Sequence, residues 1–219
     1  MTPAATRPAN AFAVAERAAL ADLMAQVGPD APTLSGDWTT RDLAAHLIVR
    51  ATRPDAAAGI LLAPLAGWNA RVMAAVARRE WAALLAEVRQ GPPRWSPQSL
   101  AVLDSETNTV EYFVHHEDVR RASEPWEPRV LDDADVATLW ARGLRLAPHV
   151  LRNSPVGVVA APTDGPAAGG ERTLRAGEPR VLLAGPVCEI VLAVYGRPTK
   201  GLELKGVDAD VEAFLAFPR

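Results

Sequence analysis

Two side chains in one short segment have the types and the spacing with which a helix binds a divalent cation, and a second carboxylate stands on the same face. Glu111 is followed by His115 four residues later and by Asp118 after seven. In an α-helix, which turns about 100° per residue, Glu111 and His115 lie about 40° apart around the axis, and Asp118 returns to almost the same direction. A glutamate and a histidine one turn apart can reach a common ion. Many helices carry such a pair in solvent, so the spacing alone leaves both interpretations open.

A second candidate ligand, His46, stands in an apolar context far from this segment. Leu47 and Ile48 follow it directly, and alanines precede it. A buried imidazole needs a polar partner. That partner is either a metal ion shared with Glu111 and His115 or a backbone carbonyl of the protein core.

Four further residues have roles that the pattern does not decide. Asp118 either accepts a hydrogen bond from a ligating histidine and orients it, or is an exposed helix carboxylate. His116 points about 100° away from His115 on a helix, so we expect a solvated neighbour, with an acid–base role as the alternative. Asn108 either contacts a ligand or sits near the helix start. Cys188, on an apolar helix, is predicted to be a small buried hydrophobic residue, with a catalytic thiol as the alternative.

Composition excludes several classes of partner. The formal net charge of −3 and the lack of a basic cluster longer than two arginines give no electrostatic basis for binding nucleic acid. The most apolar run, Ala56–Ala66, is shorter than the roughly 20 residues of a membrane-spanning helix, and the N-terminus, with Pro3 and Pro8, lacks the apolar stretch of a signal peptide. The single cysteine suits a reducing cytoplasm. We therefore expect a cytoplasmic protein whose partners are small molecules, with no nucleic acid and no membrane; a homodimer is compatible with the pattern.

Hydrophobic periodicity predicts that the candidate ligands stand on the helices of a bundle. Thr39 and Asp42 form a capping-box pattern that predicts a helix start, and Pro54 predicts the end of that helix. Helices are expected over Ala9–Val27, from Thr39 or Thr40 to Thr52, over Leu65–Gln90 with a break near residues 78–80, from Ser99 or Ser105 to Ala122, and over Leu131–Val150.

After Asn153 the pattern changes to short β-branched runs separated by turns. Strands are expected over residues 156–161, 171–174, 180–183 and 202–204. Helices are expected over residues 186–195, where Pro186 suits a first turn, and over residues 209–217. The predicted fold class is therefore α+β, with a helical bundle over residues 1–152 and a small α+β domain over residues 153–219.

Two motifs resemble those of a known family. They are Trp38-Thr-Thr-Arg-Asp-Leu-Ala-Ala-His46-Leu and Glu111-x-x-x-His115-x-x-Asp118-Val. Both are similar to motifs of the mycothiol-dependent maleylpyruvate isomerase family, which belongs to the DinB-like metal-binding four-helix bundles, and in particular to an actinobacterial metal-binding subgroup. The stretch from Gly185 to Arg197 resembles the sterol-carrier-like C-terminal unit of that family.

The resemblance implies a ligand set and a chemistry. His46, Glu111 and His115 match the three protein ligands for zinc, a set that leaves one coordination position open; nickel, cobalt, manganese and iron use similar sites. The open position would take the thiol of mycothiol and hold it as a nucleophilic thiolate. Arg197 matches an arginine that the family uses near its site, where it would pair with a substrate carboxylate. The alternative is a surface arginine that interacts with a helix dipole.

Three functional hypotheses follow from these motifs. The first is a metal- and mycothiol-dependent transferase or isomerase acting on a small electrophile. The second is a non-catalytic protein that binds a metal and a small ligand. The third is a buried polar cluster of His46, Glu111 and His115 that holds no metal.

Overall fold

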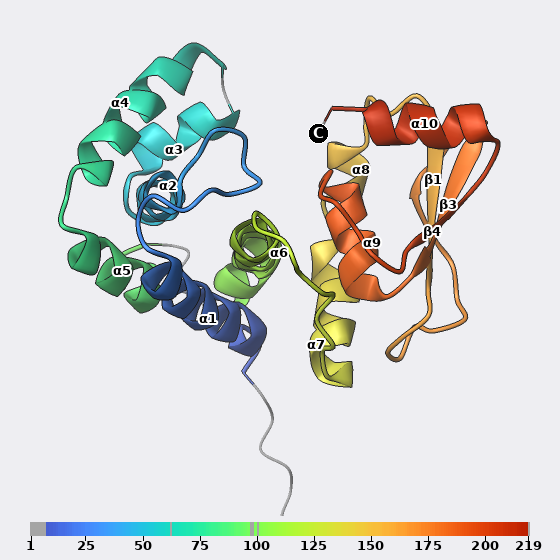
Figure 1. The fold of residues 1–219 in the computed structure, drawn as a ribbon, viewed down its shortest axis with the longest axis horizontal. Helices are drawn as coiled ribbons and strands as arrows, with labels where there is room; N and C mark the ends of the chain where they lie inside the picture. Colours follow the sequence, from blue (N-terminus) through green and yellow to red (C-terminus); the bar gives the residue numbers. More distant parts are fainter. Residues whose placement is uncertain (1–7, 62, 97–98, 100, 219) are drawn as a thin grey trace, which may run out of the picture. The chain divides into compact units, whose positions relative to one another are not determined.

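The protein has a mixed α+β architecture, as the sequence predicts. The structure is a computed structural model that describes residues 8–61, 63–96, 99 and 101–218 (Figure 1). Residues 1–7, on which the expected absence of a signal peptide partly rests, lie outside the described residues. The chain divides into two compact units, Met1–Pro125 and Trp126–Arg219. The division precedes the expected boundary at residue 152, because segment 126–152 packs on the strand Arg172–Arg175 and the helix Val187–Val194 of the second unit.

The described elements of the N-terminal unit are all helical. The expected break in its third helical region is present at residues 78–80. One helix was not predicted: Pro54 ends the preceding helix, but it also begins the next one, because proline is tolerated in a first turn. The elements are α1 (Ala11–Val27), α2 (Thr40–Thr52), α3 (Pro54–Leu61), η1 (Ala63–Leu65), α4 (Ala66–Ala77), α5 (Trp81–Gln90) and α6 (Ala101–Arg120).

Helix α2 begins where its capping box predicts. The backbone N–H of Asp42 donates to Oγ1 of Thr39 at 3.4 Å, and the backbone N–H of Thr39 donates to Oδ2 of Asp42 at 3.0 Å. A buried apolar cluster then packs α2 against its neighbours. Because this cluster draws side chains from α1, α2, α5 and α6, it fixes the placement of the two helices that carry the candidate ligands; its members include Leu20, Leu43, Leu84 and Tyr112.

The C-terminal unit is built on a four-stranded sheet of order β2-β1-β3-β4. Strands β1 and β3 are parallel, and both outer pairs are antiparallel. Helix α9 joins β3 to β4 and contacts β1 and β3. The elements are α7 (Asp133–Thr138), the π-helical turn η3 (Leu139–Gly143), α8 (Ala147–Val150), β1 (Gly157–Pro162), β2 (Arg172–Arg175), β3 (Arg180–Gly185), α9 (Val187–Val194), β4 (Glu203–Lys205) and α10 (Asp208–Ala216).

The strands and the last two helices of this unit confirm the predicted ones to within two residues. The single helix expected over Leu131–Val150 is wrong. The segment instead forms α7, η3 and α8, and η3 ends at Gly143. Pro148 stands in the first turn of α8, where its missing N–H is tolerated, whereas it would interrupt a continuous helix.

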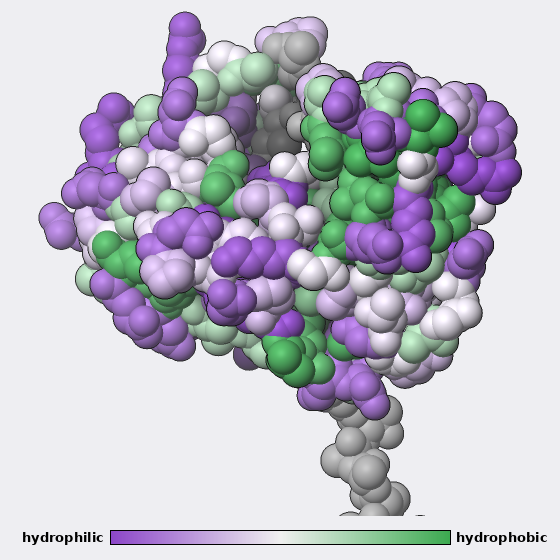
Figure 2. All heavy atoms as spheres, turned by 45° about the vertical axis from the view of Figure 1, so that its right-hand side comes forward, coloured by the Kyte–Doolittle hydropathy of each residue, from purple (hydrophilic) through white to green (hydrophobic). Residues whose placement is uncertain are grey.

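In the described part of the chain, no helix combines the length and the apolar character needed to cross a lipid bilayer. Figure 2 shows one face of the molecule, on which hydrophilic residues in purple border the hydrophobic residues in green. The large apolar side chains that are exposed come from separate segments, among them Trp95, Val130, Val207 and Leu215.

Candidate metal centre

His46 lies in the interior of α2, where it is only 6% exposed. Its Nε2 is 2.9 Å from Oε1 of Glu111 on α6. The ring also packs against the indole of Trp38, with 5.0 Å between the ring centroids. The partner of this buried imidazole nitrogen is therefore a carboxylate, and not the backbone carbonyl of the alternative interpretation.

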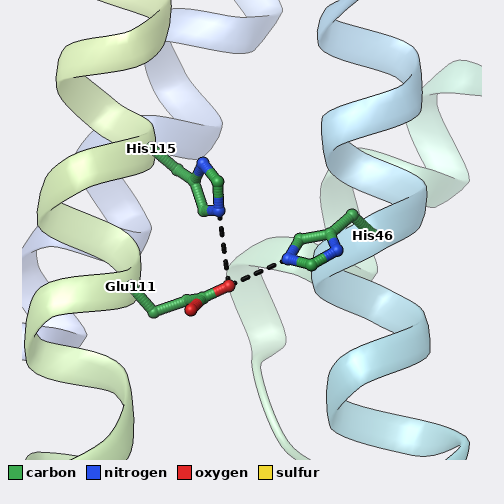
Figure 3. Close-up of side chains that lie close together, drawn as sticks. All are labelled: His46, Glu111 and His115. Carbon is green, nitrogen blue, oxygen red and sulfur yellow. Dashed lines mark hydrogen bonds and ion pairs between the residues drawn. The ribbon is translucent and has the colours of Figure 1, made fainter. Parts of the chain in front are cut away.

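Glu111 and His115 lie one turn apart on α6, as their spacing predicts. Nε2 of His115 is 3.3 Å from Oε1 of Glu111, the same oxygen that His46 contacts. Figure 3 shows this oxygen between the two imidazoles, with His46 reaching from the other helix. One ligand atom from each residue lies within 4.8 Å of the other two. The three residues therefore form a group that could hold a divalent metal ion.

This donor set fits a divalent cation in type and in spacing. Two imidazole nitrogens and a carboxylate oxygen are common zinc ligands, and ligand atoms about 2.0–2.2 Å from a tetrahedral ion lie roughly 3.3–3.6 Å from one another. The two N···O distances of 2.9 and 3.3 Å are close to that separation. An ion would replace the contacts between the carboxylate and the two imidazoles.

Asp118 holds His115 in the orientation that a ligand needs. It is fully buried, and its Oδ2 lies 2.9 Å from Nδ1 of His115 and accepts a hydrogen bond from Oγ of Ser35 at 2.7 Å. An acceptor at Nδ1 keeps a ring proton there and leaves Nε2 for the ion. The alternative of an exposed helix carboxylate is wrong. Ser35 was not predicted, because it stands in a loop and no spacing marks it.

Arg50 is a second residue that sequence reasoning missed. Its Nε lies 3.5 Å from Oε2 of Glu111, and its Nη1 donates a hydrogen bond to Oδ1 of Asn108. Arg50 follows His46 by four residues and Asn108 precedes Glu111 by three, so helical spacing was a signal that could have found both. The arginine engages one carboxylate oxygen and leaves the other to the histidines. Asn108, whose role the sequence did not decide, supports this arginine.

Neighbouring charges determine the protonation states of Glu111 and His115. Burial alone would raise the pKa of Glu111, but Arg50, His115 and His46 together outweigh burial and hold that pKa well below its ordinary value. Burial would likewise lower the pKa of His115, but the contacts with Asp118 and Glu111 raise it to about 9. At neutral pH the metal-free group therefore pairs an ionised Glu111 with a protonated His115.

We expect metal binding to release about one proton from His115 between about pH 7 and pH 8.5, because only the neutral ring binds an ion. The pKa of about 9 means that the metal-free ring is protonated throughout this range. The affinity should therefore rise about tenfold per pH unit and level off above the pKa. Calorimetric titration in two buffers of different protonation enthalpy measures the number of protons released. An affinity that does not change with pH would contradict the raised pKa.

His116 is not the solvated neighbour that was expected. It is 7% exposed, and its Nδ1 lies 2.9 Å from Oε2 of Glu16 on α1. Helix geometry does turn it away from His115, but that direction leads to α1, which packs along α6. The buried contact between Glu16 and His116 therefore joins two helices of the unit. The sequence could not show it, because the two residues stand 100 positions apart.

The C-terminal unit holds the two remaining candidates. Cys188 is 4% exposed on α9 and packs as the small hydrophobic residue that was predicted. Arg197 follows the end of the same helix, and its Nη1 donates to the carbonyl of Tyr195 at 2.7 Å. A cation at the carbonyl end of a helix is the arrangement of the alternative interpretation. Its pairing with a substrate carboxylate stays a prediction.

Comparisons with models of protein families, with curated proteins and with solved structures find no match for this chain. Among the described residues, the group formed by His46, Glu111 and His115 has the donor types and spacing of a metal site.

Proposed function

We propose that this protein binds a divalent metal ion and uses it to activate a thiol for reaction with a small electrophile. The observation that carries the proposal is the convergence of His46, Glu111 and His115 from two helices, with ligand atoms within 4.8 Å of one another. Zinc suits two imidazoles and one carboxylate best, while nickel, cobalt, manganese and iron accept similar donors. A cation held there would lower the pKa of an incoming thiol and keep it as a thiolate, the nucleophilic form.

The residues of the chain itself would bind the ion, orient its ligands and shield the site from water. Arg50 engages the second oxygen of Glu111 and so presents a single oxygen to the ion, while Asp118 orients His115. The side chains of His46, Glu111 and His115 are 8%, 21% and 13% exposed, so the site is shielded from bulk water but open to a small guest. Three protein ligands leave a coordination position for that guest.

The proposed family is the mycothiol-dependent maleylpyruvate isomerase family, with a DinB-like bundle followed by a sterol-carrier-like unit. Support comes from the two motifs, whose histidines and glutamate stand on α2 and α6 of one helical unit, and from a C-terminal unit in which α9 lies against a small sheet. In this proposal mycothiol is the co-substrate, and Arg197 pairs with a carboxylate of the electrophile.

A non-catalytic protein that binds a metal and a small ligand is the second candidate. The polar groups beside the ligands already have partners, since Asp118 contacts His115 and Ser35, and Arg50 contacts Glu111 and Asn108. Because Asp118 and Arg50 are already hydrogen-bonded, they are suited to positioning a bound ligand and less suited to transferring protons to it.

Turnover by the metal-loaded protein separates these hypotheses. With mycothiol and a cis-configured conjugated acid, we expect isomerisation or thiol addition that requires both metal and thiol and is lost in His46→Ala. His149→Ala removes an exposed histidine of the other unit and should bind metal as the wild type does. Bound metal without turnover above the His46→Ala background favours the second candidate. Less than about 0.1 equivalent of metal after supplementation would show that the cluster is only a buried polar group.

A further inference from the structure

A groove along α4 shares no side chain with the candidate metal ligands. Its volume is about 360 Å³, within the roughly 300–1,000 Å³ that small-molecule sites occupy. Helices α2, α3 and α4 are grouped in the N-terminal unit (Figure 1). The end of α2 and one side of α4 line the groove, which we call the α4 groove, with Arg53, Trp68, Arg71, Val72, Val76 and Arg79.

The floor of the α4 groove is apolar. Val72 belongs to a small buried cluster, and Val76 packs against that cluster while also lining the groove. Trp68 is 45% exposed although its ring is large and apolar. Its indole N–H donates to Oδ2 of Asp55 at 3.1 Å, which fixes the polar end of the side chain. Apolar surface held in water at a concave site favours an apolar guest.

Three arginines stand on the rim of the α4 groove. Arg53, Arg71 and Arg79 line it, and no carboxylate appears among its described lining residues. Arg53 is paired with Asp55, and Arg79 with Glu87. Arg71 is exposed and has no ion-pair partner among the residues that the structure describes. An exposed guanidinium beside an apolar floor is suited to a carboxylate that carries an apolar body.

We propose that the α4 groove binds a small amphipathic anion, a carboxylate on an aliphatic or aromatic body. The body lies on Trp68, Val72 and Val76, and the carboxylate pairs with Arg71. The face of α4 from Trp68 to Val76 extends roughly 12 Å at 1.5 Å per residue, about the length of an extended chain of ten carbon atoms. The proposal is independent of the metal site.

Titration of the full chain with decanoate, in buffer containing a chelator, tests the proposal by calorimetry and by NMR of the tryptophan indole N–H groups. We expect saturable one-to-one binding, with the largest shift at the resonance that Trp68→Phe removes. Ala75 is exposed and lines the groove, so Ala75→Trp should fill it and weaken binding at least about tenfold. Arg71→Ala should weaken binding about three- to fivefold, because exposed ion pairs contribute modestly.

The matched control is Arg78→Ala, which removes the same charge from the C-terminal end of α4 but outside the groove; we expect unchanged binding. Circular dichroism of each variant verifies that it is folded. Three results would each overturn the proposal. They are no saturable binding below the micelle concentration of decanoate, equal weakening by Arg71→Ala and Arg78→Ala, and equally tight binding of the uncharged analogue decanol.

Discussion

Zinc should raise the melting temperature of the wild-type protein by about 5–10 °C and leave that of Glu111→Gln almost unchanged. An ion that binds only the folded state stabilises it by about 2.7 kcal/mol at a hundredfold excess over Kd, and 1 kcal/mol corresponds to about 2–4 °C for a chain of this size. Oε1 of Glu111 is the atom that both histidines contact. A neutral amide at this position binds cations weakly, so the variant loses the centre of the donor set.

Scanning fluorimetry with and without zinc measures this shift for each variant. Because each variant is compared with itself, differences in melting temperature between the metal-free proteins do not affect the result. Asp118→Asn should give an intermediate shift, because loss of the group that orients a ligating histidine lowers metal affinity about 10- to 100-fold. His149→Ala should behave as the wild type. A shift in Glu111→Gln equal to that of the wild type would remove Glu111 from the ligand set.

Glu117→Gln should lower the free energy of unfolding by about 3–5 kcal/mol, because it breaks a buried ion pair from one side. Oε2 of Glu117 lies 2.6 Å from Nε of Arg121, and each side chain is only 1% exposed. Without the carboxylate, a guanidinium stays in the interior and loses the charge that compensates it. Urea unfolding followed by circular dichroism measures the change.

Arg120→Gln is the matched control for this effect. Arg120 contacts the same carboxylate at 2.9 Å, but its side chain is 25% exposed, so water compensates its loss. The expected cost is below about 1 kcal/mol. Equal costs for the two variants would mean that burial does not set the strength of these contacts.

The features that could be predicted from the sequence are those with local signals. The start of α2 depends on Thr39 and Asp42, three residues apart, and the contact between Glu111 and His115 depends on one helical turn. Strands β1 and β3 are short, largely apolar runs with glycine and proline at or beside their ends. In each of these cases the residues that make the structure are neighbours along the chain, so their spacing carries the information.

What the sequence did not reveal depends on contacts between distant segments. The burial of His116 requires α1 to cover one face of α6, and Ser35 reaches a residue 83 positions away. The change from α7 to the π-helical turn η3 likewise goes with packing on α9, which periodicity alone cannot report. Arg50 is the exception, since its position one turn after His46 was visible.

Asp118 on α6 contacts the loop that leads into α2, so one residue connects the segments that carry the candidate ligands. Asp118 lies near the end of α6. Its side chain accepts a hydrogen bond from the hydroxyl of Ser35, and its backbone carbonyl accepts one from the N–H of Leu34 at 3.1 Å. These two residues stand just before Thr39, where α2 is capped. Contacts within the protein thus hold these segments together, so little chain entropy would be lost when an ion binds. Unlike small zinc modules that fold around their ion, this protein would stay folded when a chelator removes the ion.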